Sequence, residues 1–134
     1  MSAIELVPVG RVESPLKDPA QAPMQGHEGA PAAWLVFGPA YAGALDGIRV
    51  GDELVVLAWL DRARREVLRV HPRDDPAIPE RGVFGTRSQD RPNPIGLHRV
   101  RVLEVDGARL HVSDLEAIDG TPIVDVKIAL DPPP

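Results

Sequence analysis

The sequence predicts an all-β or mostly-β fold: a small closed or partly closed β-barrel with long proline-rich loops. Its 134 residues include 15 prolines and 12 glycines, which favour many short elements joined by structured turns. Apolar and polar residues alternate in several short segments, and no long helical period is present. Closing about seven to nine such strands into a barrel would remove exposed sheet edges.

The first elements are short and separated by a long connection. Ile4–Val12 is expected to form a strand, and the proline-punctuated segment Ser14–Ala33 is expected to be either an ordered loop or a mobile lid. Ala33–Phe37 reads as a short strand, and Tyr41–Leu45 fits one helical turn. This region therefore predicts two strands on either side of a loop long enough to be functional.

The middle of the chain begins with a continuous apolar run, Leu54–Leu60, which predicts a strand buried on both faces. Asp61–Arg65 then makes a turn into a further expected strand, Glu66–Val70. A second proline-punctuated loop is expected over His71–Arg81.

The clearest hairpin is Arg99–Val112. Val100 and Val102 alternate with arginines, and Asp106-Gly107 predicts a type I′ turn.

The last expected strand is Ile123–Leu130. The predicted faces are Val124, Val126 and Ile128 on one side, and Asp125 and Lys127 on the other. The length and the lack of a plausible linker indicate a single domain over residues 1–134.

The net charge of −5 is unevenly spread. Residues 62–101 hold ten arginines and five acidic residues, whereas the rest holds five basic and fifteen acidic residues. This pattern is consistent with a solvated mixed-charge surface or with a local site for an anionic ligand. No apolar segment is long enough to cross a membrane and no signal peptide is evident, so a cytoplasmic protein is expected. The absence of cysteine excludes disulfides and thiolate metal sites.

The usual cofactor motifs are missing. There is no glycine-rich Rossmann or P-loop motif, and no Gly-x-Ser-x-Gly nucleophile elbow. The four histidines lack metal-ligand spacing, so each is expected to be a surface or hydrogen-bonded residue, and no metal site is expected.

One loop places Arg87, Arg91 and Asn93 on a backbone stiffened by two prolines. Such a loop loses little further entropy on binding, and arginine can grip a carboxylate or phosphate with two hydrogen bonds. The alternative is a structural role, with an arginine paired to a carboxylate such as Asp90 or Asp119.

A second cluster is acidic: Ser113-Asp114-Leu115-Glu116, followed by Asp119-Gly120-Thr121. It is either a polar loop with internal hydrogen bonds or a group that binds a cation. Cationic and acidic groups together suit S-adenosylmethionine, whose amino-acid end carries both charges and whose sulfonium carries a third. Methyl transfer mainly requires alignment of the nucleophile, the methyl group and the sulfur. The spacing makes this cofactor chemically reasonable without establishing it.

Three segments resemble one known family. GVFGTRSQDRPNPIGL (Gly82–Leu97), LEAIDGTPIVDVK (Leu115–Lys127) and VGRVESP (Val9–Pro15) closely resemble the TrmO family, also called TsaA-like or YaeB-like. The resemblance spans almost the whole chain. It implies a small β-barrel, a homodimer with the cofactor held near the subunit interface, and an S-adenosylmethionine-dependent methyltransferase. The best-known acceptor in the family is N6 of N6-threonylcarbamoyladenosine at position 37 of tRNA.

The resemblance also implies cofactor contacts, position by position. They are Pro23, Gln25, Asp61, Arg62, Arg87, Leu97, Ser113, Asp114, Leu115 and Glu116. It assigns no catalytic residue, although a carboxylate such as Asp61 or Glu116 is a candidate general base. The chain departs from the family at Met24, where family members often have arginine, and at Ile128-Ala129 after the last motif. Longer members of the family also carry a C-terminal domain, which is not expected in this chain.

Four functions remain open at this point. A tRNA methyltransferase comes first, followed by a methyltransferase acting on a small molecule. The others are a non-catalytic S-adenosylmethionine-binding protein and an unrelated β-barrel that mediates interactions.

Overall fold

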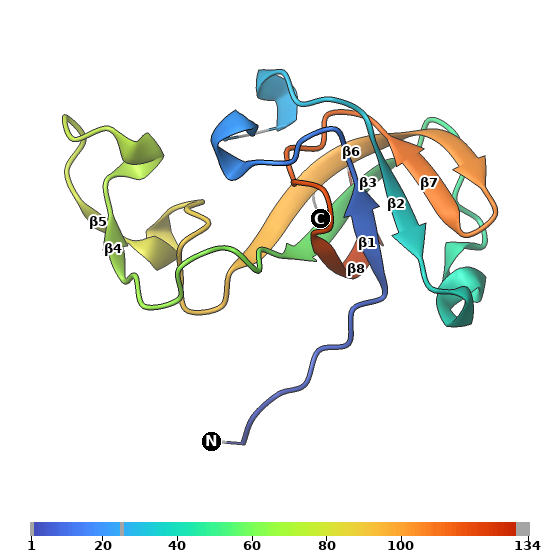
Figure 1. Ribbon diagram of the computed structural model, residues 1–134, viewed down its shortest axis with the longest axis horizontal. Helices are drawn as coiled ribbons and strands as arrows, with labels where there is room; N and C mark the ends of the chain where they lie inside the picture. Colours follow the sequence, from blue (N-terminus) through green and yellow to red (C-terminus); the bar gives the residue numbers. More distant parts are fainter. Residues whose placement is uncertain (1, 25, 131–134) are drawn as a thin grey trace.

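Six antiparallel strands close into a ring in the computed structural model, which describes residues 2–24 and 26–130. In order around the ring these are β1 (Gly10–Glu13), β2 (Ala33–Phe37), β7 (Arg109–Val112), β6 (Ile95–Asp106), β3 (Glu53–Trp59) and β8 (Pro122–Ile128). Two short strands, β4 (Arg69–Val70) and β5 (Arg81–Gly82), pair separately from the ring (Figure 1). The expected mostly-β barrel is therefore confirmed.

Alternating apolar side chains fill the interior of the ring. Leu35 on β2, Val56 on β3 and Leu110 on β7 are fully buried members of one core cluster. The strand predicted at Ala33–Phe37 is confirmed with the same bounds. The expectation that Leu54–Leu60 is buried on both faces is wrong, because alternate residues of β3 remain partly exposed on its outer face.

The predicted hairpin is present as β6 and β7, but its turn differs from the expected one. Asp106 still pairs with Arg109, so the loop consists of Gly107 and Ala108. Gly107 has φ +59° and Ala108 has no positive φ, which matches a type II′ turn rather than the predicted type I′.

The last strand, β8, ends at Ile128, which is 55% exposed. The register shifts where Leu57 and Ala58 of β3 meet it. Because of this irregularity, Ile123 lies in the core and Val126 packs against it. The predicted faces are therefore confirmed for Val126 and Ile128, which pair with the inward Val56 and Leu54, and for Asp125 and Lys127 on the other face, but the prediction is wrong for Val124.

The strand predicted at Ile4–Val12 is mostly absent. Only its last residues belong to β1, and Ile4 is 88% exposed. Pro8 cannot donate a ladder hydrogen bond, which explains why the strand does not extend towards the N-terminus. Figure 1 shows this segment running away from the barrel.

The segment of residues 14–32 is called the first loop here. It contains two short 3₁₀ turns, η1 (Pro19–Gln21) and η2 (Gly26–Glu28). A third, η3 (Pro39–Leu45), confirms the helical turn expected at Tyr41–Leu45. Among the described residues, no helix has the length and apolar character that a membrane crossing requires.

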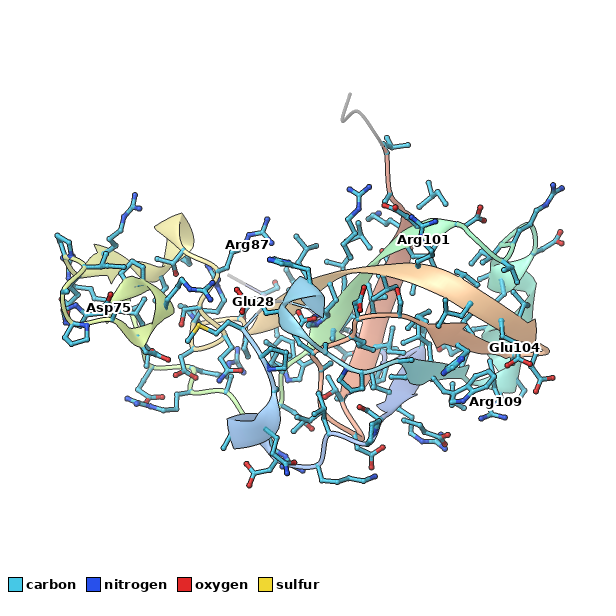
Figure 2. The ribbon with its side chains drawn as sticks, turned by 90° about the horizontal axis from the view of Figure 1, so that it is seen from above. Glu28, Asp75, Arg87, Arg101, Glu104 and Arg109 are labelled. Atoms are coloured by element: carbon cyan, nitrogen blue, oxygen red, sulfur yellow. The ribbon has the colours of Figure 1, made fainter. Side chains whose placement is uncertain are left out.

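Residues 61–94 form a projection that we call the arm. It comprises β4, η4 (Pro72–Asp74), β5 and η5 (Val83–Gly85). The strand predicted at Glu66–Val70 is reduced to the two residues of β4, which pair with β5 instead of joining the barrel. Figure 2 shows Asp75 at the outer end of the arm, with Glu104 and Arg109 at the opposite end of the molecule.

Candidate functional site

The unequal lengths of β6 and β7 expose part of the edge of β6. β7 pairs with β6 only from Val102 onward, so it leaves the first half of β6 uncovered on that side. The chain that leaves β7 continues along this edge. The Ser113 N–H donates to the Arg101 carbonyl at 2.9 Å, and the Ser113 hydroxyl accepts from the Arg101 N–H at 3.1 Å. These bonds bring the acidic segment predicted from sequence beside the arginines of β6.

The first loop packs directly on this acidic segment. A Cβ atom at Gly26 would overlap the carbonyl oxygen of Asp114, so this contact requires glycine. The Leu115 N–H donates to the Pro31 carbonyl at 3.1 Å. Asp114 itself adopts φ +52°, an uncommon value for a residue other than glycine. Two segments about ninety residues apart in the chain thus meet through their backbones.

Between these elements lies a cavity of about 290 Å³, which we call the loop cleft. It is lined by Gly26, His27, Glu53, Leu97, Arg99, Val100, Arg101, Ser113, Asp114 and Glu116. Its lining combines two arginines from β6 with two acidic residues from the segment after β7. A ligand that carries both charges and an apolar portion has complementary groups in this cleft.

Glu53 organises the cationic end of the loop cleft. Its carboxylate accepts from Nε of Arg99 at 2.7 Å and from the Arg101 guanidinium at 2.9 Å. The hydrogen bond from Arg99, reinforced by the charges of Arg99 and Arg101, holds the pKa of Glu53 below its ordinary value. Two guanidinium groups thus converge on the single carboxylate of Glu53 at this end of the cleft.

A buried pair closes the acidic side. His98 points into the barrel with only 4% of its side chain exposed, and its Nδ1 lies 2.5 Å from Oε1 of Glu116. Sequence reasoning expected a surface or hydrogen-bonded histidine and did not identify this partner. The alternation along β6 contained a usable signal, because it places His98 on the same inward face as Val100 and Val102.

The structure brings together four of the predicted cofactor contacts. Leu97, Ser113, Asp114 and Glu116 line the loop cleft. Leu115 does not line it, because its side chain is fully buried in the core.

In the first loop, Pro23 does not belong to the cleft lining, and Gln25 lies outside the residues that the structure describes. The neighbouring Gly26 and His27 line the cleft instead, and sequence reasoning did not predict them. Gly26 and His27 line the cleft because of the way the first loop packs on Asp114, and no local sequence pattern reveals this packing.

The remaining predicted contacts lie on the arm, outside the cleft lining. Asp61 and Arg87 are exposed, and the Arg62 guanidinium lies 3.5 Å from the Lys17 carbonyl of the first loop. Arg87 forms no hydrogen bond or ion pair with the described residues. Figure 2 places it on the part of the arm nearer the barrel, away from the outer end at Asp75.

Arg91 has a structural role in its loop. Its guanidinium donates to the carbonyls of Val83 at 2.7 Å, Ser88 at 2.9 Å and Thr86 at 3.2 Å. The alternative in which a loop arginine pairs with Asp90 is wrong for Arg91, because the Arg91 guanidinium binds carbonyl groups instead.

Asn93 and the two carboxylates considered as arginine partners, Asp90 and Asp119, also form hydrogen bonds or ion pairs. Asn93 accepts from Arg65 at 3.0 Å, and Asp90 accepts from the backbone N–H of Arg64 at 2.8 Å. Asp119 accepts from the Ser14 N–H at 3.0 Å and pairs with Lys17 at 2.8 Å.

A larger cavity of about 530 Å³ lies beside β1 and the start of β2. Its charged lining residues already pair with one another, Arg11 with Glu13 and Lys17 with Asp119. The loop cleft is the stronger candidate, because four of the residues that the sequence singled out as cofactor contacts line it.

Several S-adenosyl-L-methionine-binding proteins are similar in sequence to most of this chain. Two S-adenosyl-L-methionine-binding proteins, from Archaeoglobus fulgidus and Methanothermobacter thermautotrophicus (the latter described as probable), are both 44% identical to it. The matches cover 91% and 92% of this chain, and 86% and 88% of those proteins. A longer A. fulgidus protein, described as a probable S-adenosyl-L-methionine-binding protein, is also 44% identical over 95% of this chain. The match covers only 34% of that protein.

The fold comparison points the same way. The crystal structure of TrmO from Pseudomonas aeruginosa matches 97% of this chain with a TM-score of 0.77 and 26% identity. This chain spans 56% of that protein. The model of the tRNA-methyltransferase O N-terminal domain matches residues 11–131. The chain therefore belongs to the family of the tRNA-methyltransferase O N-terminal domain.

Proposed function

We propose that this chain binds S-adenosylmethionine in the loop cleft and transfers its methyl group to N6 of N6-threonylcarbamoyladenosine at position 37 of tRNA. The observation that carries the proposal is the meeting of Leu97 with the acidic segment and the arginines of β6 around one cavity. Arg99 and Arg101 are complementary to a carboxylate, whereas Asp114 and Glu116 are complementary to positive charge. The names of the S-adenosyl-L-methionine-binding relatives support the same ligand.

When bound, S-adenosylmethionine supplies an electrophilic methyl group on a positively charged sulfur. The role of the chain is to hold and orient the donor and to exclude water. Glu116 remains a candidate base for the acceptor nitrogen, because its carboxylate lines the cleft and is 13% exposed.

Isothermal titration calorimetry with S-adenosylmethionine tests the binding step. We expect Glu116→Gln to weaken binding by roughly tenfold or more, because a hydrogen bond or ion pair to a charged group is worth about 1.5–3 kcal/mol. Glu104→Gln is the matched control, because Glu104 is exposed at the end of the molecule far from the arm (Figure 2). Absence of heat from the wild-type chain would reject the proposal.

The tRNA acceptor is supported by the arginine-rich arm. The arm itself, residues 61–94, carries eight arginines and six acidic residues, although the whole chain has an acidic excess. Phosphate contacts by such arginines would make binding weaken as salt rises. Mass spectrometry of tRNA from cells that lack the gene tests the acceptor. Unchanged methylation of threonylcarbamoyladenosine, with no second enzyme compensating, would favour a small-molecule acceptor or a protein that binds the donor without transferring its methyl group.

We also propose that the chain acts as a homodimer in the cytoplasm. Leu97 and Ile95 project from the outer face of β6 with 44% and 41% exposure, beside Leu57 and Trp59 of β3. A second copy covering this apolar strip could bring its arm to the cleft of the first copy. This arrangement would account for the position of Arg87 outside the cleft of its own chain.

Mixing two inactive variants tests this arrangement. If each site combines one copy's cleft with the other's arm, Arg87→Ala and Glu116→Gln chains that exchange subunits should regain roughly a quarter of wild-type activity. Sites confined to single chains would regain none. A wild-type chain that remains monomeric by light scattering would remove the dimer from the proposal.

A further inference from the structure

The pair formed by His98 and Glu116 has a role that stability does not explain. His98 Nδ1 lies 2.5 Å from Oε1 of Glu116, while its Nε2 is buried and has no hydrogen-bond partner among the described residues. A buried polar atom without a partner is unfavourable. Val100 and Val102 occupy the next two inward positions of β6 without that disadvantage.

The surroundings hold the imidazole ring in one place. A Cβ atom at position 96 would lie 2.5 Å from Nε2 of His98, so the ring requires glycine at that position. The same hypothetical atom would lie 3.1 Å from the side chain of Leu60, which bounds this space on another side. The ring therefore has little room to turn away from Glu116.

The other carboxylate oxygen faces the first loop. A Cβ atom built at Gly26 would lie 3.0 Å from Oε2 of Glu116, and both residues line the loop cleft. One oxygen of Glu116 is thus held by the barrel interior, and the other is directed to the side where the first loop closes the cleft. A carboxylate fixed at one oxygen presents the second in a defined direction.

We propose that His98 is a positioning residue that donates its Nδ1 proton to Glu116 and thereby aims Oε2 at a positively charged group of the bound ligand. This inference rests on the proposed function, in which that ligand is S-adenosylmethionine. His98 does not touch the ligand; it acts through Glu116.

Two substitutions separate positioning from packing. His98→Asn retains a side-chain N–H near the place of Nδ1, whereas His98→Leu removes the donor and retains apolar bulk. Calorimetry with S-adenosylmethionine should show about tenfold weaker binding for His98→Leu and near wild-type binding for His98→Asn. In a Glu116→Gln background, His98→Leu should cause little further loss, because its effect passes through Glu116. Thermal unfolding of each variant identifies any that fail to fold.

A spectroscopic measurement tests the pair itself. Long-range ¹H–¹⁵N spectra of the histidine-labelled wild-type chain should show His98 protonated at Nδ1, and Glu116→Gln should shift that nitrogen signal. Equal affinities for folded His98→Leu and His98→Asn, or an unprotonated Nδ1, would overturn this inference while leaving the proposed function intact. A wild-type chain that binds no S-adenosylmethionine would overturn both.

Discussion

The barrel is stabilised internally by one kind of interaction and the arm by another. In the barrel, apolar side chains such as Leu35 and Leu110 are fully buried between paired strands. In the arm, β4 and β5 share only two residue pairs, and arginine side chains bond several backbone carbonyl groups. Arg91 alone bonds three carbonyl groups of its own loop, and Arg65 bonds the Pro92 carbonyl at 2.7 Å.

This difference assigns most of the folding stability to the barrel and leaves the arm freer to change. Burial stabilises the barrel cooperatively, so its residues are expected to determine whether the chain folds. Charged hydrogen bonds on the surface of the arm set local geometry with little burial. Residues can therefore change in the arm with less risk to the fold than in the barrel.

The largest effect is expected in the barrel core. Leu110→Ala should lower the free energy of unfolding by about 2–5 kcal/mol, because the fully buried side chain leaves a cavity. Leu103→Ala is the control, since Leu103 lies on the adjacent strand and is 43% exposed. Urea unfolding measures both variants. Equal losses would mean that burial does not distinguish these positions.

The next effect concerns the arm. Arg91→Ala should lower the free energy of unfolding by about 1–3 kcal/mol and speed hydrogen exchange in the loop around residues 83–93, because three carbonyl groups each lose a hydrogen bond from the guanidinium. Arg87→Ala should leave both unchanged, since Arg87 forms no hydrogen bond or ion pair with the described residues. If Arg91→Ala instead increased hydrogen exchange in the barrel as much as in the arm, the two regions would not unfold as separate units.

Acid should affect the two regions unequally. The pKa of Glu53 is lowered by Arg99 and Arg101, and that of Asp119 by Lys17 and the Ser14 N–H. Their stabilisation is therefore complete above the ordinary values of 4.5 and 3.8 and is lost as the pH falls through the lower folded values. In the arm, backbone hydrogen bonds and the Arg64 side chain also lower the pKa of Glu66, so acid weakens that contact too. The carbonyl bonds of Arg91 do not titrate in this range.

Unfolding by urea from neutral pH down to about pH 3 tests this difference, with hydrogen exchange reporting each region. Glu53→Gln should reduce the loss of stability at acid pH. An unchanged acid response in that variant would remove Glu53 from the explanation.

The smallest effect is expected where the arm meets the first loop. Arg73 pairs with Glu28 at 2.7 Å, and both side chains are partly exposed. Arg73→Ala should change the free energy of unfolding by less than about 1 kcal/mol, yet speed exchange at η2. Arg69→Ala is the matched control, because Arg69 pairs with Glu80 inside the arm. Faster exchange at η2 in both variants would show that the contact with Glu28 is not what holds the first loop.

The barrel was more predictable from sequence than the arm. β2 and the β6–β7 hairpin follow from local alternation and turn residues, which act over neighbouring positions. The irregularity in β8 depends on its distant partner strand. The shortening of the strand expected at Ile4–Val12 follows instead from Pro8, a local signal that the prediction did not use. The β4–β5 pairing was missed, because two-residue strands carry almost no pattern.

The candidate site was predictable in part. Leu97 and three members of the predicted acidic cluster, Ser113, Asp114 and Glu116, line one cavity. Asp119 and Gly120 of the same cluster line the other cavity instead. The partners of Arg91 were not predicted, because backbone carbonyl groups leave no trace in a sequence. The pairing of His98 with Glu116 required knowing that the segment after β7 follows the open edge of β6.

The place of β8 in the ring affects how the protein is made. β8 lies between β1 and β3, although it is the last of the ring's six strands along the chain. Until Pro122–Ile128 leaves the ribosome, the edges of β1 and β3 that face it remain unpaired. Unpaired strand edges promote aggregation. The nascent chain therefore passes through an open sheet during translation, and this interval is when a chaperone would be most useful.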